Sequence, residues 1–173
     1  LIKKLLMMLA HQVGAEVSVN ELACSLGMNK ATVNKYLDLL EETFVIFRLP
    51  AFSTNPRKEI SKNHKIYFYD TGIRNAILNE FSLNPLRSDI GQLWENWVVA
   101  EFAKNNLLFG QKENLYFWRS RAKSEVDLIV KNGERISAYE IKWKKQNINK
   151  RAFENQYKVK VQIIDSSNPL FIN

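Results

Sequence analysis

The stretch "SEVDLIVKNGERISAYEIKW", residues 124–143, decides the fold because it places two β-rich runs around one Asn-Gly pair. Both runs are rich in β-branched and aromatic residues, which strands favour. An Asn-Gly pair between such runs, here Asn132-Gly133, is the strongest short-range signal for a two-residue hairpin turn. The stretch therefore predicts an antiparallel hairpin, and the charged residues inside its strands need an explanation.

A loop made of Asn132 and Gly133 sets the register of the hairpin. The facing pairs are then Lys131 with Glu134, Asp127 with Ala138, and Glu125 with Glu140. Strand side chains alternate between two faces. One face would hold Glu125, Asp127, Ala138, Glu140 and Lys142. The other would hold Val126, Leu128, Tyr139, Ile141 and Trp143.

In this register Asp127 and Glu140 are diagonal neighbours, roughly 7 to 8 Å apart at the backbone, so one cation could bind between their carboxylates. Oxygen ligands favour Mg²⁺ or Mn²⁺ over Zn²⁺. The alternative is a solvated strand face with a cross-strand ion pair to Lys142, which is common on hairpins. The hairpin alone leaves both open.

Glu95 lies in "GQLWENWVVAEF", where a helix is expected. At about 100° per residue, Val98, Val99 and Phe102 fall within roughly 60° of it around the helix. A carboxylate on an apolar stripe must be paired, protonated or bound to a cation. Alternatively, Glu95 is partly exposed at the edge of a surface formed by the neighbouring tryptophans.

The elements around the hairpin predict a mixed α/β fold, in which a mixed central sheet is flanked by helices. Strands are expected at 65–70, 115–119, 125–131, 135–143 and 158–164, and helices at 72–81, 89–105 and 149–157. The first part of the chain has a different pattern of helices and strands. We therefore divide it into residues 1–60 and 61–173, with the polar connector "NPRKEISKNHK" at the boundary.

Residues 1–60 show the pattern of a winged helix-turn-helix. Ser18 and Glu21 form a capping box for a helix over 19–26, and Gly27 ends that helix. Asn29 can cap the next helix, which carries an apolar stripe. The β-rich "FVIFRLPAF" follows and would supply the wing.

Composition narrows the function classes. The 173 residues carry a net charge of +7, which favours acidic partners such as nucleic acid. The single cysteine and two separated histidines argue against disulfides and zinc sites. No apolar run approaches the roughly 20 residues that span a bilayer, so we expect a cytoplasmic protein without a membrane partner. The sequence opens inside a helical pattern without an initiator Met, which suggests a missing upstream segment.

A helix Glu, a strand Asp and Glu140-Ile141-Lys142 after a hairpin resemble the PD-(D/E)xK nuclease superfamily, which has the restriction-endonuclease-like fold. Val126 stands where that superfamily's name has proline. More of the chain resembles the bacterial and archaeal AAA-type ATPases that end in a DUF4143 region. The matching segments are "ELACSLGMNKATVNKYLDLLEE", "KIYFYDTGIRNAIL", "GQLWENWVVAEF", "LYFWRSRAKSEVDLIV" and "YEIKW".

The resemblance implies a metal-dependent nuclease. Asp127, Glu140 and the Ile141 carbonyl would hold Mg²⁺ or Mn²⁺, while Glu95 would bind a second ion or orient water. Lys142 would position or deprotonate the nucleophile. An ATP-binding module is implied only upstream, because no GxxxxGK[ST] stretch occurs here. The alternative is a non-catalytic module that binds DNA or protein.

Two basic groups are candidate contacts to nucleic acid, most plausibly DNA. On the second helix of the helix-turn-helix, the side chains that would meet the major groove are Lys30, Thr32, Asn34 and Lys35. Lys144 and Lys145 directly follow the second hairpin strand and could contact phosphates. Such helices also join modules or bind protein, and such lysines also form ordinary solvated surfaces. The oligomeric state cannot be inferred from the sequence.

Overall fold

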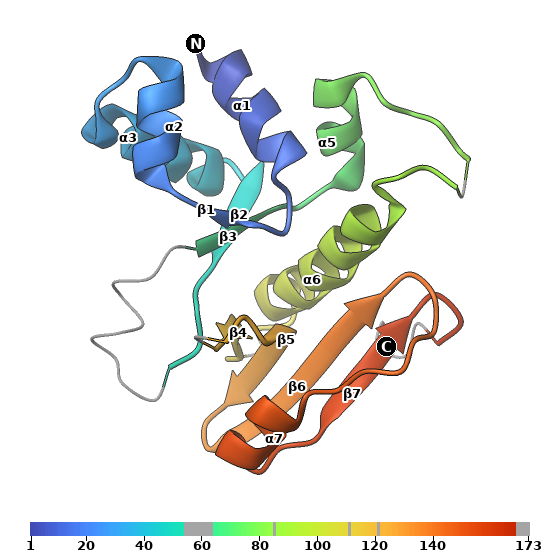
Figure 1. The fold of residues 1–173 in the computed structure, drawn as a ribbon. Coiled ribbons are helices and arrows are strands. Elements are labelled where there is room, and N and C mark those ends of the chain that lie inside the picture. Colours follow the sequence, from blue (N-terminus) through green and yellow to red (C-terminus); the bar gives the residue numbers. More distant parts are fainter. Residues whose placement is uncertain (54–63, 85, 111, 121, 169–173) are drawn as a thin grey trace.

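The computed structural model describes residues 1–53, 64–84, 86–110, 112–120 and 122–168 of the chain (Figure 1). The elements in order are α1 (Ile2–His11), β1 (Glu16–Val17), α2 (Val19–Leu26), α3 (Lys30–Glu42), β2 (Ile46–Leu49), β3 (His64–Phe68), α5 (Thr71–Leu78), α6 (Ile90–Leu108), β4 (Asn114–Arg119), β5 (Glu125–Asn132), β6 (Arg135–Lys142), α7 (Arg151–Tyr157) and β7 (Val161–Asp165). The fold is mixed α/β, as predicted, and its strands form two sheets.

The predicted caps of α2 and α3 are present. The Ser18 side chain accepts a hydrogen bond from the Glu21 N–H, and Asn29 Oδ1 accepts one from the Thr32 N–H at 2.8 Å. Gly27 ends α2 in the left-handed region at φ 64°, where the lack of a Cβ removes the steric cost. Local side-chain chemistry therefore sets the start and end of these helices.

The two sheets divide the strands unevenly. In the three-stranded sheet, β3 is the central strand and pairs antiparallel with β1 and β2. The four-stranded sheet has the order β4-β5-β6-β7, antiparallel except for the parallel pair β6-β7, so it is mixed as expected. The predicted boundary at residue 60 and most of the polar connector lie outside the described residues.

Helix α6 joins the two sheets. In Figure 1 it runs between the four-stranded sheet and the group formed by α1, α2, α3 and α5 with the three-stranded sheet. Asn96, which is 1% exposed, accepts a hydrogen bond from the Phe68 N–H at 2.8 Å and donates one to the Phe68 carbonyl at 2.9 Å. One side chain thus replaces the partners that a further strand would give this end of β3.

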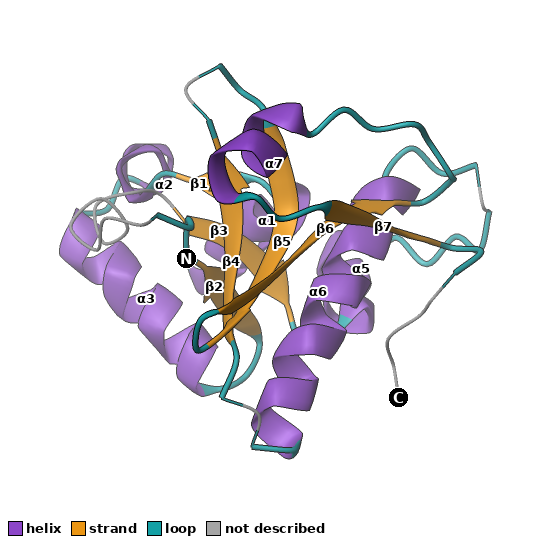
Figure 2. Ribbon diagram, turned by 90° about the horizontal axis from the view of Figure 1, so that it is seen from below, coloured by secondary structure: helices purple, strands orange, loops and turns teal. Residues whose placement is uncertain are grey.

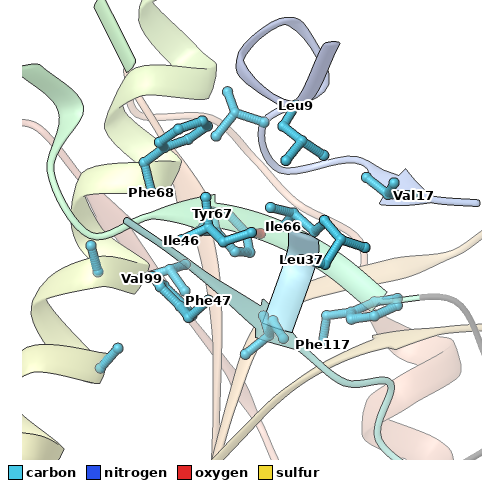
Figure 3. Close-up of a cluster of buried hydrophobic side chains, with 14 of the residues drawn as sticks. Leu9, Val17, Leu37, Ile46, Phe47, Ile66, Tyr67, Phe68, Val99 and Phe117 are labelled. Atoms are coloured by element: carbon cyan, nitrogen blue, oxygen red, sulfur yellow. The ribbon is translucent and has the colours of Figure 1, made fainter. Parts of the chain in front are cut away.

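A single apolar core continues across both parts of the chain. Figure 3 shows Leu9, Val17 and Leu37 from the N-terminal helices and strand in the same cluster as Val99 of α6 and Phe117 of β4. A second cluster lies between α7 and the other face of the four-stranded sheet, around Phe153 (Figure 2). None of the described helices is long and apolar enough to cross a membrane.

The register of the hairpin differs from the prediction by two residues. The closing pair is Asn132 with Arg135, so the loop is Gly133-Glu134 rather than Asn132-Gly133. Gly133 is the first loop residue and has a φ of 59°, which is the glycine position of a type II′ turn. The predicted Asn132-Gly133 loop, as a type I′ turn, would instead have needed a positive φ at Asn132. A two-residue shift keeps every side chain on its own face.

The predicted division of apolar residues between the faces is wrong at one point. The pairing of β4 with β5 shifts between Tyr116 and Trp118, which marks a β-bulge. Val126 consequently packs in the α7 cluster with Ala138, whereas Leu128 packs in the main core with Ile141. An extra residue in one strand reverses the side-chain alternation beyond it. The bulge lies at Asp127, the residue that the sequence singled out.

Candidate functional site

Asp127 and Glu140 are buried side by side at the ends of β5 and β6, with 6% and 3% of their surface exposed. Their burial contradicts the solvated strand face of the alternative prediction, but the ion pair to Lys142 that belonged to that alternative is present. Asp127 Oδ2 accepts a hydrogen bond from the Ile141 N–H at 2.8 Å, so a carboxylate takes the place of a backbone partner beside the bulge. Asp127 is therefore held firmly against β6.

Two lysines neutralise this pair of carboxylates. Lys142 Nζ lies 3.3 Å from Asp127 Oδ2 and 2.7 Å from Glu140 Oε1. Lys150 Nζ lies 2.7 Å from the other oxygen of Glu140 and also donates to the Glu125 carbonyl at 2.6 Å. Burial alone lowers the pKa of Lys142, but Asp127 and Glu140 outweigh burial, so the pKa is raised and the side chain is charged.

Glu95 lies on α6 with partners of its own. Its Oε1 accepts a hydrogen bond from the Tyr67 hydroxyl at 2.6 Å and lies 3.3 Å from Lys65 Nζ. Burial raises the pKa of Glu95, Lys65 and Tyr67 oppose that rise, and the charge of Asp127 adds to it. The sequence correctly marked Glu95 as a carboxylate that needs a partner, but it did not identify the partner.

The residue that sequence reasoning missed is Lys65, which is 3% exposed. Its ammonium pairs with both Glu95 and Glu125 and lies 5.5 Å from the centre of the Phe117 ring. We placed Lys65 where the polar connector ends and the strand over 65–70 begins. A usable signal was present, because alternation along that strand places Lys65 on the same face as Tyr67.

An open pocket of about 650 Å³ lies beside the carboxylates and lysines described above. It lies where the start of α6 meets the end of β6, and its lining comprises Ser88, Asp89, Ile90, Gly91, Gln92, Glu95, Ile141, Lys142, Trp143, Lys144 and Gln146. Glu95 and Lys142 thus face a common space. Asp127 and Glu140 do not line it and lie behind Lys142, so a ligand in the pocket would meet the lysine first.

The predicted ligand set fits a divalent cation at two side chains. Asp127 Oδ2 and Glu140 Oε1 converge on one cationic atom, Lys142 Nζ. The N–H and carbonyl of a strand residue point to the same edge, so the Ile141 carbonyl also faces Asp127. In the described part of the chain, however, no three Asp, Glu, His or Cys residues are grouped closely enough to hold an ion. Glu95 is engaged with Lys65 and Tyr67 instead.

The two predicted basic groups are not brought together. Lys30, Asn34 and Lys35 are exposed on α3. Thr32 is partly buried, and its hydroxyl donates to Asn29 Oδ1 at 3.0 Å as part of the helix cap. Lys144 and Lys145 are exposed in the segment between β6 and α7, which lies on the opposite side of the molecule from α3 in both views (Figures 1 and 2).

The start of α6, which forms one wall of the pocket, is held by Asp89. Arg87 Nε and Arg74 Nη1 each lie 2.6 Å from its carboxylate, and the two arginines keep the pKa of Asp89 below its usual range, Arg87 most strongly. Such a group stabilises the fold above the unfolded-state pKa of about 4, and this stabilisation is lost as the pH falls below that value and through the lower pKa of the folded state.

We therefore expect Asp89→Asn to flatten the acid dependence of stability. The effect should be at most about 1 kcal/mol, since solvent screens much of this partly exposed pair. Urea midpoints measured between pH of about 5 and about 3 would show it. Glu134→Gln, in the exposed hairpin turn, is the control. An unchanged slope in Asp89→Asn would contradict the assigned role of Asp89.

In comparisons with known proteins, each half of the chain is similar to a different family. Residues 90–171 match the DUF4143 family. DUF4143 is described as a domain of unknown function. Residues 1–84 match another family, the domain of unknown function DUF8612. The DUF4143 prediction is confirmed, and the region with this match contains Glu95, Asp127, Glu140 and Lys142. Lys65 and Tyr67 fall in the DUF8612 match.

Two curated relatives extend over both regions. The uncharacterized protein Mb2031c of Mycobacterium bovis and the uncharacterized protein Rv2008c of Mycobacterium tuberculosis are each 34% identical to this chain over 137 residues, or 78% of its length. The chain spans 30% of the length of each of these relatives. No solved structure matches the chain.

Proposed function

We propose that the DUF4143 region is a metal-dependent phosphodiesterase of the restriction-endonuclease-like fold, acting on nucleic acid, with DNA as the expected substrate. The supporting observation is that Asp127 and Glu140, from the two hairpin strands, aim one oxygen each at a single cationic atom. That atom belongs to Lys142, the lysine of the Glu140-Ile141-Lys142 triplet. The pocket in front of it leaves space for a substrate phosphate.

Each residue of the site has a separate role in this reaction. Asp127, Glu140 and the Ile141 carbonyl would hold Mg²⁺ or Mn²⁺ once the Lys142 ammonium swings toward the pocket. The bound ion supplies a nucleophilic water and neutralises the phosphate. Lys142, which is 30% exposed at its side chain, then faces the phosphate and stabilises its developing negative charge. Glu95, at the pocket wall, orients the water or holds a second ion.

The proposal extends to the rest of the protein. The N-terminal region, predicted over residues 1–60, would be a winged helix to which β3 adds the central strand of the sheet. Its α3 would be the helix that meets DNA, and in the full-length protein an AAA-type ATPase module would precede it. ATP belongs to that module. Lys30, Asn34 and Lys35 contact one stretch of nucleic acid, and Lys144 and Lys145 contact another beside the pocket. Their exposure supports these contacts. The cytoplasm is the compartment in which such a protein would act.

A second candidate function is a non-catalytic module that binds DNA or protein. The ion pairs favour it, because Lys65, Lys142 and Lys150 already neutralise the carboxylates without a metal. Such a module would hold nucleic acid in a salt-sensitive complex, or hold a protein, but would not cut. Its four-stranded sheet and pocket would then be a binding platform.

Incubation with labelled DNA and RNA separates the two functions. The phosphodiesterase predicts cleavage products with Mg²⁺ or Mn²⁺ and none with EDTA. Single-stranded and duplex substrates should be compared, since the chain does not specify one. Binding that falls with salt, without cleavage under any metal, would favour the non-catalytic module. Absence of both cleavage and binding would remove nucleic acid as the substrate class.

A further inference from the structure

Lys65 brings the first part of the chain into the carboxylate site. It lies on β3, in the sheet formed with β1 and β2, yet its ammonium contacts Glu95 on α6 and Glu125 on β5. Its side chain is 4% exposed, so it is not a surface lysine that samples many positions. Glu125 is held in turn by Arg119, at 3.8 Å. One buried cation therefore ties three elements together.

The placement of Glu95 depends on the N-terminal region. Its carboxylate contacts Lys65 and Tyr67, both on β3. Gly14 leaves room for it, since a Cβ at that position would lie 3.1 Å from Glu95 Oε1. These three residues lie within residues 1–84, the DUF8612 match, whereas Glu95 lies in the DUF4143 match. The second region alone would leave this carboxylate without the partners that orient it.

We propose that Lys65 is a positioning residue of the carboxylate site, fixing Glu95 at the wall of the pocket that it shares with Lys142. The N-terminal region thereby completes the site rather than merely adjoining it. This inference rests on the proposed function insofar as it concerns a divalent ion. The positioning itself requires no ion, because Lys65, Glu95 and Tyr67 are in contact within the chain alone.

Charge alone predicts the opposite effect on metal binding. Removing a lysine reduces the repulsion that a divalent cation feels nearby, so a purely electrostatic Lys65 would weaken binding, and Lys65→Met would tighten it. A positioning residue has the reverse effect, because Glu95, which would orient the water of the ion or hold a second ion, loses the group that holds it in place. Changes in supporting partners typically weaken metal affinity by about 10- to 100-fold. The sign of the change thus separates the two roles.

The test is a Mn²⁺ titration followed by electron paramagnetic resonance, with the whole chain and five variants, one of them the double variant Lys65→Met with Glu95→Gln. Lys65→Met should weaken binding by about tenfold, and Lys65→Arg should restore most of it. In a Glu95→Gln background, Lys65→Met should have no further effect. The control is Lys104→Met, which removes a lysine that pairs with Glu101 later on α6. It should leave Mn²⁺ binding unchanged.

Urea unfolding of the same variants provides a readout without metal. Glu95→Gln should offset part of the destabilisation caused by Lys65→Met, because it removes the carboxylate left without its cation. Additive effects in unfolding would overturn the positioning role even if no variant bound Mn²⁺. Unchanged or tighter Mn²⁺ binding in Lys65→Met would overturn it too. Absence of Mn²⁺ binding in the unmodified chain, with coupling intact, would instead reject only the proposed metal chemistry.

Discussion

Asp127→Asn is expected to lower metal-dependent cleavage by about a thousandfold. Ion-based charge stabilisation is worth several kcal/mol, and about 1.4 kcal/mol corresponds to tenfold in rate. Asparagine keeps an oxygen that can accept the Ile141 N–H, so the link between β5 and β6 should survive. The change removes the negative charge that an ion requires while preserving the shape of the side chain.

Cleavage rates under saturating Mn²⁺, compared with thermal unfolding of the same samples, would test this. Asp38→Asn is a matched control, because Asp38 lies on α3, is half exposed and pairs with Arg48 outside the carboxylate site. It should cut like the unmodified chain. If Asp127→Asn cleaved at a similar rate to Asp38→Asn, the observed nuclease activity would have to come from another site or another protein.

Asn96→Ala is expected to give the largest loss of stability, roughly 2 to 4 kcal/mol. Asn96 is the partner of both the N–H and the carbonyl of Phe68 in a buried position. Alanine would leave these two backbone groups without partners, and each costs about 1 to 3 kcal/mol when buried. The change would also loosen α6 against β3, the contact that aligns Glu95 with Lys65.

Urea unfolding monitored by tryptophan fluorescence would measure this loss. Asn105→Ala, later on the same helix and partly exposed, is the matched control and should change stability by less than about 1 kcal/mol. If both variants lost the same small amount, the Asn96 amide would not be the link between α6 and β3 that its hydrogen bonds indicate.

Local signals in the sequence were sufficient for the ends of α2 and α3, whereas the short strand β1 was not predicted. Ser18, Asn29 and Gly27 act on neighbours within four residues, and the predicted helix boundaries follow from them. The hairpin was also predictable, and Asp127, Glu140 and Lys142 meet as the pattern indicated. The register of the hairpin was not predictable, because the same Asn-Gly pair permits two loops. The loop that forms leaves Asn132 in the strand.

Features that depend on distant parts of the chain were not predictable from local patterns. The bulge at Asp127 arises from the pairing of β5 with β4 and reverses the side-chain alternation expected from the sequence. The burial of Lys65 requires Glu95 and Glu125, which are 30 and 60 residues away in sequence. Strand alternation could have placed Lys65 beside Tyr67, but not beside either carboxylate.

The central claim is that Asp127 and Glu140 form a divalent cation site. Anomalous diffraction from crystals soaked in Mn²⁺ tests it most directly. We expect a peak between Asp127 Oδ2 and Glu140 Oε1, near the Ile141 carbonyl, with the Lys142 ammonium displaced toward the pocket. A crystal with Lys142 still between the two carboxylates at saturating Mn²⁺, and no peak there, would contradict it.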